Sequence, residues 1–306
     1  AALQLVRSFG KLGFEVHVAE KTSLIPSFFS KYAHKSFVYP DPNDELNFVN
    51  SIKSYCDNNG IDQIYPVVDE CLFALVKNRS LFEGIEIPFT NVDNLIMFRD
   101  KSLTIKQCEK LKLPHPKTFL SDNPNFEKIS KELDFPIILK PKVGSGSRGI
   151  ELVTNLEDLP SKFLKVKKQY GSPLIQEFIP NGGACGTEVL LKKGKPLAIF
   201  SHFRIREYPI SGGPSTYRRP LKSKILEKFA VKLLSSVNWD GPAMVEFRID
   251  KRTGVPKIME VNGRYWGSLA CSISSGVDFP KLHYYYSIGK SFKKPEYDLH
   301  TRSRWE

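Results

Sequence analysis

Along the first hundred residues, segments with the apolar spacing of a helix are followed by segments with that of a strand. The pattern therefore predicts helices and strands in turn. The expected elements are a helix over 1–10, a strand over 14–19, a helix over 44–58, a strand over 63–68 and a helix over 69–80. This alternation with short connections predicts a parallel α/β sheet within residues 1–97. A helix of such a sheet follows a strand, so we expect the first strand to lie outside the 306 residues.

The remainder of the chain is richer in strands. A helix over 100–113 is stopped by Pro114 and Pro116, which mark a boundary between lobes. Hairpins with single helices between them predict antiparallel α+β structure, in one lobe over 98–180 and another over 181–306. The expected strands cover 135–140, 150–154, 173–178, 186–192, 196–204, 243–250 and 256–262, and a helix covers 222–237.

Composition supports a folded, soluble chain. Hydrophobic residues make up 41% of the 306 residues, enough to bury the cores of two or three lobes. The sequence has no apolar run of the roughly 18 residues that span a bilayer and opens on no charged-then-apolar leader. We therefore expect no membrane association and a cytoplasmic location. The five cysteines form no Cys-x-x-Cys pair, which favours free thiols over disulfides or a zinc site.

The charge balance is basic, with 45 Lys and Arg against 33 Asp and Glu and a net charge of +12. Such an excess favours anionic partners: a nucleotide, a phosphorylated or polycarboxylate substrate, or nucleic acid. No basic stretch is interleaved with aromatic residues, so nucleic acid is the weakest of these candidates.

A glycine-rich loop follows the strand expected over 135–140. It runs from Lys140 to Gly149 and reads KPKVGSGSRG. Alternate glycines let successive N–H groups turn toward an anion, and Lys140 and Lys142 add positive charge. The loop lacks the Gly-Lys-Ser/Thr of a Walker motif and the strand-to-helix placement of a dinucleotide fingerprint. Alone, it fits a basic hairpin turn as well as a phosphate site.

Two carboxylates and an amide are expected to meet on the last hairpin. Glu260 and Asn262 lie two apart on a strand and share a face, and the turn over 251–254 brings Glu246 beside them. This all-oxygen set suits Mg²⁺, which prefers carboxylates together with phosphate oxygens. Either glutamate alone fits a solvated strand face, whereas the trio followed by Arg264 favours a metal site.

The strand expected over 173–178 ends in a proline turn at Pro180. A hinge of this kind offers backbone donors and acceptors to the edge of an adenine ring and apolar walls to its faces. Glu188, on the next strand, is a candidate acceptor for ribose hydroxyls. Without its neighbours, this segment fits a buried strand with a solvent-facing glutamate better than a nucleotide site.

In this order and spacing, the segments resemble the ATP-grasp superfamily. The matching pieces run from about Phe98 to Gly267 and read FRDKSLTIKQCEKLKLPHPKT, FPIILKPKVGSGSRGI, LIQEFIP, GTEVLL and GPAMVEFRID…IMEVNGRYWGS. Within the superfamily the chain looks most like carbamoyl-phosphate-synthase-like ligases and ATP-dependent carboxylate-amine ligases, with which it shares residues 206–216. The resemblance implies a Rossmann-like N-terminal lobe before a two-lobed α+β ATP-grasp fold, and it allows a homodimer.

The resemblance also implies roles for single residues. The lysines and the loop would hold ATP phosphates, the hinge would hold adenine, and Glu188 would hold ribose. The nucleotide-binding set is Lys101, Lys140, Lys142, Gly144, Ser145, Gly146, Ser147, Gly149, Glu177, Phe178, Ile179 and Glu188. The ligands of Mg²⁺, or of Mn²⁺ in its place, would be Glu246, Glu260 and Asn262, and Arg264 would steady the transferring phosphoryl group.

The activity that the resemblance implies is phosphorylation of a carboxylate by ATP, followed by capture of the acyl phosphate by an amine or a thiol. Arg204 and Arg206 are the expected carboxylate anchors, because guanidinium forks match carboxylates bidentately, although surface arginines on a strand would look the same. The loop over 211–216 is a candidate substrate loop. Two alternatives remain: phosphorylation of carbonate or carbamate, and a nucleic-acid-binding module on a degenerate scaffold. We assign no role to His202, and packing to Trp266.

Overall fold

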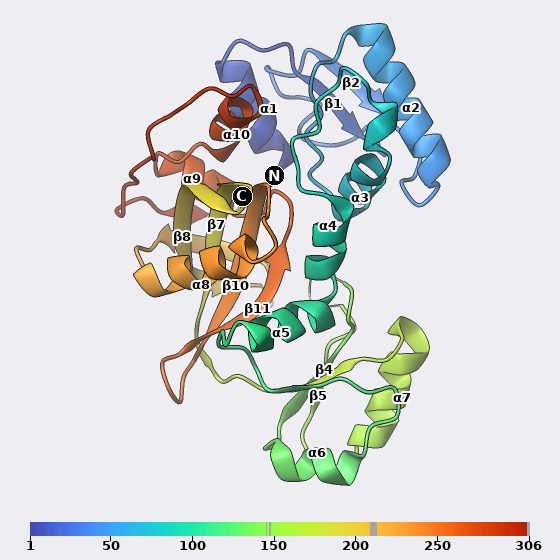
Figure 1. The fold of residues 1–306 in the computed structure, drawn as a ribbon, viewed down its shortest axis with the longest axis vertical. Coiled ribbons are helices and arrows are strands. Elements are labelled where there is room, and N and C mark those ends of the chain that lie inside the picture. Colours follow the sequence, from blue (N-terminus) through green and yellow to red (C-terminus); the bar gives the residue numbers. More distant parts are fainter. Residues whose placement is uncertain (145, 147, 209–212, 305–306) are drawn as a thin grey trace.

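The computed structural model describes residues 1–144, 146, 148–208 and 213–304. Figure 1 shows an N-terminal lobe in blue and cyan, a large lobe in yellow to red beside it, and a small green lobe at the opposite end. The helices α4 (Val92–Arg99) and α5 (Lys101–Lys110) run from the first lobe toward the small one. The lobe boundaries after residues 97 and 180 stay predictions.

The N-terminal lobe contains a two-stranded parallel sheet of β1 (His17–Glu20) and β2 (Lys35–Val38). Its helices agree with the predicted pattern, since the opening and the second and third expected helices all form. They are α1 (Ala2–Lys11), α2 (Glu45–Asn59) and α3 (Asp69–Lys77), with a short 3-10 turn, η1 (Arg79–Leu81). The Rossmann-like character of this lobe stays a prediction.

The strand predicted over 63–68 is wrong as a full strand. Only an isolated parallel bridge between Gln63 and Glu86 forms there. Ile64 N donates to Glu86 O and Glu86 N donates to Asp62 O, so one edge of the segment is paired. No strand of the described chain pairs with its other edge. The segment has a strand's apolar pattern but lacks the second neighbour that would make a ladder.

The small lobe is a four-stranded antiparallel sheet with two helices on it. The strands β3 (Thr118–Phe119), β4 (Ile137–Lys140), β5 (Glu151–Val153) and β6 (Leu174–Glu177) lie in the order β3-β6-β4-β5. The helices α6 (Phe126–Glu132) and α7 (Leu159–Tyr170) contribute apolar side chains, among them Phe163, to a core of its own. This arrangement confirms the predicted hairpin that flanks the glycine-rich loop.

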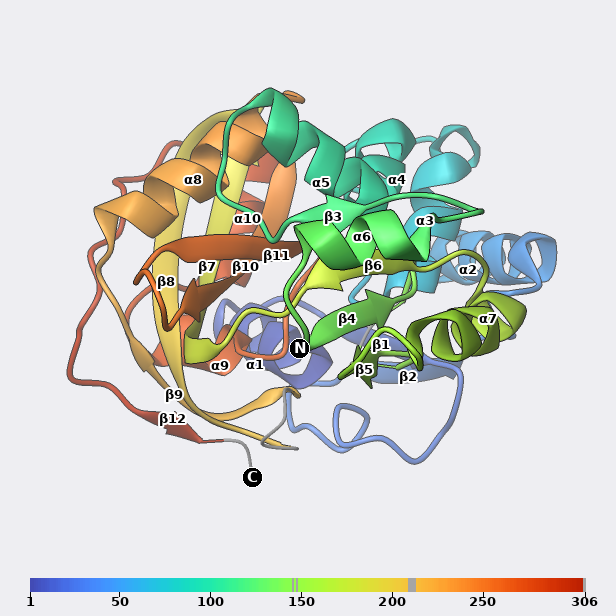
Figure 2. The same ribbon diagram turned by 90° about the horizontal axis from the view of Figure 1, so that it is seen from below.

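The large lobe is built on a six-stranded antiparallel sheet in the order β11-β10-β7-β8-β9-β12. The helix α8 (Lys224–Ser235) packs its apolar face on β7 and β8 (Figure 2). The strands are β7 (Asn181–Lys192), β8 (Lys195–Glu207), β9 (Ser215–Pro220), β10 (Gly241–Asp250), β11 (Pro256–Asn262) and β12 (Ser303–Arg304). Two further helices follow, α9 (Leu269–Ser274) and α10 (Phe279–Ser287).

Two chain crossings join the small and large lobes, and both are fastened to the β10–β11 hairpin. On the first crossing, Pro114 O accepts from Ile258 N at 2.9 Å. On the second, Pro180 O accepts from Lys251 N at 3.1 Å. The hairpin that carries the predicted metal ligands is therefore also the attachment point of the small lobe.

Free thiols are confirmed, because all five cysteines are unpaired and buried. The described helices include none that is both long and apolar enough to cross a membrane.

A buried histidine joins the N-terminal lobe to the large lobe. His283 on α10 is fully buried, and its Nε2 donates to Pro88 O at 2.5 Å because a carbonyl can only accept. Its Nδ1 therefore accepts from the Tyr265 hydroxyl at 2.8 Å. Gly241 leaves room for this contact, since a Cβ there would lie 3.0 Å from Pro88 O. Burial lowers the pKa of His283 to about 4, although its bond to Pro88 opposes the shift.

The free energy of unfolding is expected to decrease as the pH is lowered from about 6.5 to about 4. In that window the unfolded chain protonates His283 and the folded chain does not, so acid favours unfolding. Between pH 7 and pH 5 we expect this residue to contribute a loss of about 2 kcal/mol in the free energy of unfolding. Urea titrations of wild type and His283→Gln measure it: the variant is less stable at pH 7 but has the shallower pH dependence. His300→Gln is the control, and equal slopes in all three proteins contradict the prediction.

Candidate nucleotide and metal site

The β10–β11 hairpin brings the predicted metal ligands together. Glu246 lies directly opposite Glu260, and Asn262 lies opposite Met244. The Asn262 side-chain amide donates to Glu246 Oε1 at 3.1 Å. A register shift after Glu246 marks a bulge at the site. The three side chains share one face of the sheet, as the sequence predicts.

Two lysines from other elements face this hairpin. Lys101, the first residue of α5, places its Nζ 3.4 Å from Glu260 Oε2 and donates to Gly144 O at 2.7 Å. Lys140 ends β4 and is 5% exposed. Burial, with the charge of Lys101 beside it, lowers the pKa of Lys140 to about 8, and Glu260 opposes the shift.

Lys140 shows that the site suits an anion. Within the described residues its ammonium forms no hydrogen bond or ion pair, although the side chain is buried. Burial of most of a lysine side chain makes its charge costly, and a phosphate group placed between Lys101, Lys140 and the carboxylates would offset that cost. The chemistry of this donor set therefore fits a nucleotide phosphate.

The carboxylates, conversely, suit a cation. Burial raises the pKa of Glu260, and the facing Glu246 raises it further, while Lys101 and Lys140 oppose the shift. A divalent ion between the two glutamates would relieve this repulsion. The described residues contain no group of three or more His, Cys, Asp or Glu side chains arranged to hold a metal. Mg²⁺ would thus be held by Glu246, Glu260 and Asn262 together with phosphate oxygens.

The glycine-rich loop connects β4 to β5 and borders the two lysines. Gly146 and Gly149 have φ of 65° and 75°, which favour glycine. A Cβ on Gly149 would also lie 2.7 Å from the Tyr170 ring. Ser145 and Ser147 lie outside the described residues. Lys142 directs its ammonium toward Asp122, at 4.0 Å, so its expected phosphate contact stays a prediction.

The three arginines predicted to be catalytic occupy different environments. Arg204 contacts Glu246 at 2.5 Å and Glu207 at 3.2 Å. Burial alone would lower the pKa of Arg204, but these two carboxylates raise it above its ordinary value. Arg206 is exposed on the same strand. Of the two expected anchors, only Arg204 therefore touches the metal hairpin, and it does so through Glu246.

Arg264 follows the hairpin and reaches the N-terminal lobe. Its Nε lies 3.0 Å from Asp69 Oδ2, at the start of α3. Sequence reasoning missed Asp69, because an acidic residue at a helix N-terminus is ordinary and gives no functional signal. The contact places Arg264 where the first and third lobes meet.

Glu177 has a different position from the one expected of an adenine neighbour. Its carboxylate accepts from Lys257 Nζ at 2.8 Å, from Lys117 N at 3.1 Å and from Arg252. Burial alone would raise the pKa of Glu177, but these bonds lower it. The carboxylate therefore ties the hinge to the β10–β11 turn. Ile179 is buried, and the adenine role of the Phe178–Ile179 backbone stays a prediction.

The expected ribose contact of Glu188 stays a prediction. Its side chain is fully buried, and Oε1 lies 2.8 Å from His202 Nδ1 and 3.0 Å from the Ser268 hydroxyl. Its Oε2 is also buried and has no hydrogen-bond partner among the described residues. His202, to which we assigned no role, is the partner of Oε1, and Trp266 is fully buried, as its packing assignment predicts.

The geometry agrees with what comparison with known proteins shows. The model of the ATP-grasp domain matches residues 98–268, which is more than half of the chain. The chain therefore belongs to the ATP-grasp family. The relatives that it resembles include a D-alanine–D-alanine ligase.

Three curated relatives show the range of this family. The D-alanine–D-alanine ligase of Carboxydothermus hydrogenoformans is 29% identical over 206 residues, 60% of this chain and 65% of that ligase. The carbamoyl-phosphate synthase of Methanobrevibacter smithii is 22% identical over 291 residues, 81% of this chain and 75% of its own. Biotin carboxylase 2 of Populus trichocarpa is 22% identical over 287 residues, which are 86% of this chain and 53% of that carboxylase. The chain thus spans less than two thirds of the first and the last of these proteins.

Solved structures share the fold over nearly the whole chain. The N5-carboxyaminoimidazole synthetase of Staphylococcus aureus, solved with ADP, has a TM-score of 0.76 at 18% identity and covers 97% of this chain and 77% of its own. A biotin carboxylase from Campylobacter jejuni, in complex with β-γ-ATP, has a TM-score of 0.77 at 19% identity. The match covers 96% of this chain and 70% of that carboxylase chain. At such identities these similarities show the ATP-grasp fold and no more.

Replacing Glu260 by Gln is expected to separate ligand binding from stability. The raised pKa means that folding disfavours the ionised carboxylate, so Glu260→Gln without ligand should be as stable as wild type or more so. Mg-ATP at a hundred times its Kd should add about 2.7 kcal/mol to the free energy of unfolding of wild type and little to that of the variant. Thermal unfolding measures both effects, with exposed Glu83→Gln as the matched control. An equal Mg-ATP shift in wild type and Glu260→Gln contradicts the metal assignment.

The contact between Glu177 and Arg252 is expected to be structural. A double-mutant cycle of Glu177→Gln and Arg252→Ala should give a coupling of about 0.5–1 kcal/mol in urea unfolding without ligand, since Arg252 is half exposed. Lys251→Ala, at the neighbouring position, is the control for Arg252. If unfolding shows no coupling and Mg-ATP affinity alone responds to Glu177→Gln, the carboxylate serves the nucleotide instead.

Proposed function

We propose that the protein is an ATP- and Mg²⁺-dependent ligase that activates a carboxylate as an acyl phosphate and transfers the acyl group to an amine. One observation supports this most. Lys101 on α5 and buried Lys140 on β4 meet the β10–β11 hairpin, which carries Glu246, Glu260 and Asn262. Membership of the family and the names of its relatives favour ligation over simple nucleotide binding.

The residues divide the work between charge and position. Lys101 and Lys140 would neutralise phosphate oxygens, and Glu246, Glu260 and Asn262 would hold the metal, which would add positive charge beside the phosphates. A substrate carboxylate oxygen then attacks the γ-phosphorus, the bond to the β-phosphate oxygen breaks, and ADP leaves. In the second step the amine nitrogen attacks the acyl carbon, phosphate leaves, and the nitrogen loses a proton. The glycine-rich loop would exclude water between the steps, because an acyl phosphate hydrolyses.

Arg204 and Arg264 are the proposed contacts of the substrate. Arg204 is bound by Glu246 and Glu207 without ligand. If Glu246 bound a cation, the guanidinium of Arg204 would be free to turn toward the substrate carboxylate. Arg264, held by Asp69, would face the transferring phosphoryl group. Arg206 is the second proposed carboxylate anchor, and the loop over 211–216, of which 211 and 212 lie outside the described residues, is proposed to contact the substrate.

A second candidate is phosphorylation of carbonate or carbamate. The relatives that favour it are the carbamoyl-phosphate synthase and the biotin carboxylase, which match 81% and 86% of this chain. We also propose a homodimer, as described for the biotin carboxylase domain of Hydrogenobacter thermophilus.

An ADP-release screen is expected to separate these functions. Mg-ATP is offered with carboxylates alone, amines alone, pairs of both, and bicarbonate alone. A ligase should release ADP above background only with a matching pair, and Glu260→Gln should lower that rate at least about a hundredfold, because it loses a metal ligand. ADP release with bicarbonate alone favours the second candidate. Glu83→Gln is the control for folding and should keep the wild-type rate.

A further inference from the structure

His202 on β8 is a buried histidine with an unused ring nitrogen. Glu188 Oε1 lies 2.8 Å from His202 Nδ1, and an ionised carboxylate can only accept a hydrogen bond. Nδ1 therefore carries the proton of the neutral ring, and the lone pair is on Nε2. Within the described residues Nε2 has no hydrogen-bond partner, although His202 is 0% exposed. A buried acceptor without a donor is costly, so this nitrogen calls for a partner.

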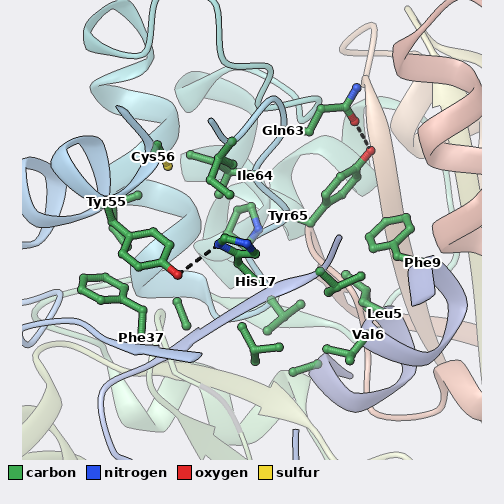
Figure 3. Close-up of a pocket in the computed structure, with 18 of the residues that line it drawn as sticks. Leu5, Val6, Phe9, His17, Phe37, Tyr55, Cys56, Gln63, Ile64 and Tyr65 are labelled. Carbon is green, nitrogen blue, oxygen red and sulfur yellow. Dashed lines mark hydrogen bonds between the residues drawn. The ribbon is translucent and has the colours of Figure 1, made fainter. Parts of the chain in front are cut away.

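Two other histidine rings with little exposed surface show the contrast with His202. In a groove of about 650 Å³ in the N-terminal lobe, the Tyr55 hydroxyl bonds to His17 Nδ1 at 3.0 Å (Figure 3). Glu15 Oε1 lies 3.0 Å from His17 Nε2, so both nitrogens of this ring are used. Both nitrogens of His283 are used as well. Burial of a histidine in this protein therefore does not by itself leave a ring nitrogen unpartnered.

The ring of His202 lies on the same face of the large sheet as the predicted metal ligands. His202 is directly opposite Gly186 on β7, and Gly186 is directly opposite Glu246 on β10. Residues opposite each other share a face of the sheet, so only a glycine stands between the histidine and Glu246. Two strand spacings, about 10 Å, separate the backbones of these two residues.

Gly186 lets the ring lie over β7. A Cβ on Gly186 would lie 2.4 Å from His202 Cε1, so any other residue there would displace the imidazole. Arg204, two residues further along β8, is on the same face, and its guanidinium contacts Glu246. The side chain of Arg204 must therefore also cross β7, beside the ring. Because Arg204 is the proposed carboxylate anchor, the acyl group of the substrate would lie close to His202.

We propose that His202 is the general base of the amine-transfer step and that Glu188 is its positioning residue. This assignment rests on the function proposed above, in which the amine loses a proton. The amine nitrogen forms its bond to the acyl carbon, the bond from that carbon to the phosphate oxygen breaks, and phosphate leaves with the electron pair. His202 Nε2 takes the proton from the nitrogen, and the Glu188 carboxylate offsets the charge of the imidazolium. The first step transfers no proton and does not need this base.

Movement of Arg204 would open the way to Nε2. Without ligand, Glu246 and Glu207 hold the guanidinium, and the side chain fills space over β7 beside the ring. A guanidinium that turned toward the substrate would leave this space to the amine. Met244 borders the same space, since its sulfur would lie 3.1 Å from a Cβ on Gly186, and a thioether side chain adapts its shape readily.

Hydroxylamine separates the proposed base from the rest of the site. It is unprotonated at neutral pH and traps an acyl phosphate as a hydroxamate without help from a base. Carboxylates are screened with Mg-ATP and hydroxylamine, and those that react are then offered with a panel of primary amines. His202→Asn keeps a side-chain N–H for Glu188 and removes Nε2. Ser268→Ala is the matched control, because it removes the other hydrogen bond to Glu188 Oε1.

We expect His202→Asn to slow amide formation at least about a hundredfold and hydroxamate formation less than about threefold. Ser268→Ala should change both rates by the same factor. Equal losses of both reactions in His202→Asn overturn the assignment, because a merely structural histidine would give that result. An unchanged amide rate overturns it too, and so does a wild type that forms hydroxamates but no amide. Absence of hydroxamate with every carboxylate in wild type contradicts the proposed function itself.

Nitrogen-15 NMR of wild type with labelled histidine tests the same pair without reference to a reaction. The His202 ring is assigned through correlations with its own backbone. We expect its proton on Nδ1 and a bare Nε2 in the ligand-free protein. A proton on Nε2 overturns the assignment. This measurement decides the question if His202→Asn fails to fold.

Discussion

The candidate site depends most on a balance of charges, most of them partly buried, where the lobes meet. Lys101 and Lys140 come from the small lobe and the helix that leads to it, and Glu246 and Glu260 come from the large lobe. Without the other pair, the two lysines would repel each other, and so would the two glutamates, because the dielectric constant there is low. Facing each other, the pairs offset part of this repulsion and leave a gap in charge that a phosphate and a divalent cation can fill. Ligand binding and the contact between the lobes therefore involve the same four charged side chains.

The remaining interactions around this site keep its members in place. Asp69 holds Arg264, His283 holds Tyr265 one residue further on, and Ser268 covers the Glu188–His202 pair. The segment after β11 is thus fixed from three directions, by the N-terminal lobe, by α10 and by the large sheet. A segment fixed in this way costs little entropy when it binds a ligand, which is the condition for a preorganised site.

Prediction from sequence succeeded where partners are close in the chain. Glu246, Glu260 and Asn262 lie on one hairpin, so the two-residue period and one turn place them. The same reasoning missed the partners of Glu177 and Glu188 and the incomplete pairing of residues 63–68. The partners of Glu177 are 75 and 80 positions away, at Arg252 and Lys257, and Ser268 is 80 positions from Glu188. A strand pattern over 63–68 could not show that, within the described residues, only one edge of the segment is paired. Long-range pairing, and not local propensity, decided each of these cases.

The fastening of both lobe crossings to one hairpin has a mechanical consequence. Pro114 O accepts from Ile258 N on β11, and Pro180 O accepts from Lys251 N, just after the end of β10. Two fixed points define an axis, so rotation about the line that joins them is the motion of the small lobe that would keep both bonds. In such a rotation Glu246 and Glu260 would stay with the large lobe, whereas Lys140 and the glycine-rich loop would move with the small lobe. A ligand between the lobes would then contact fixed carboxylates on one side and a movable lysine and loop on the other.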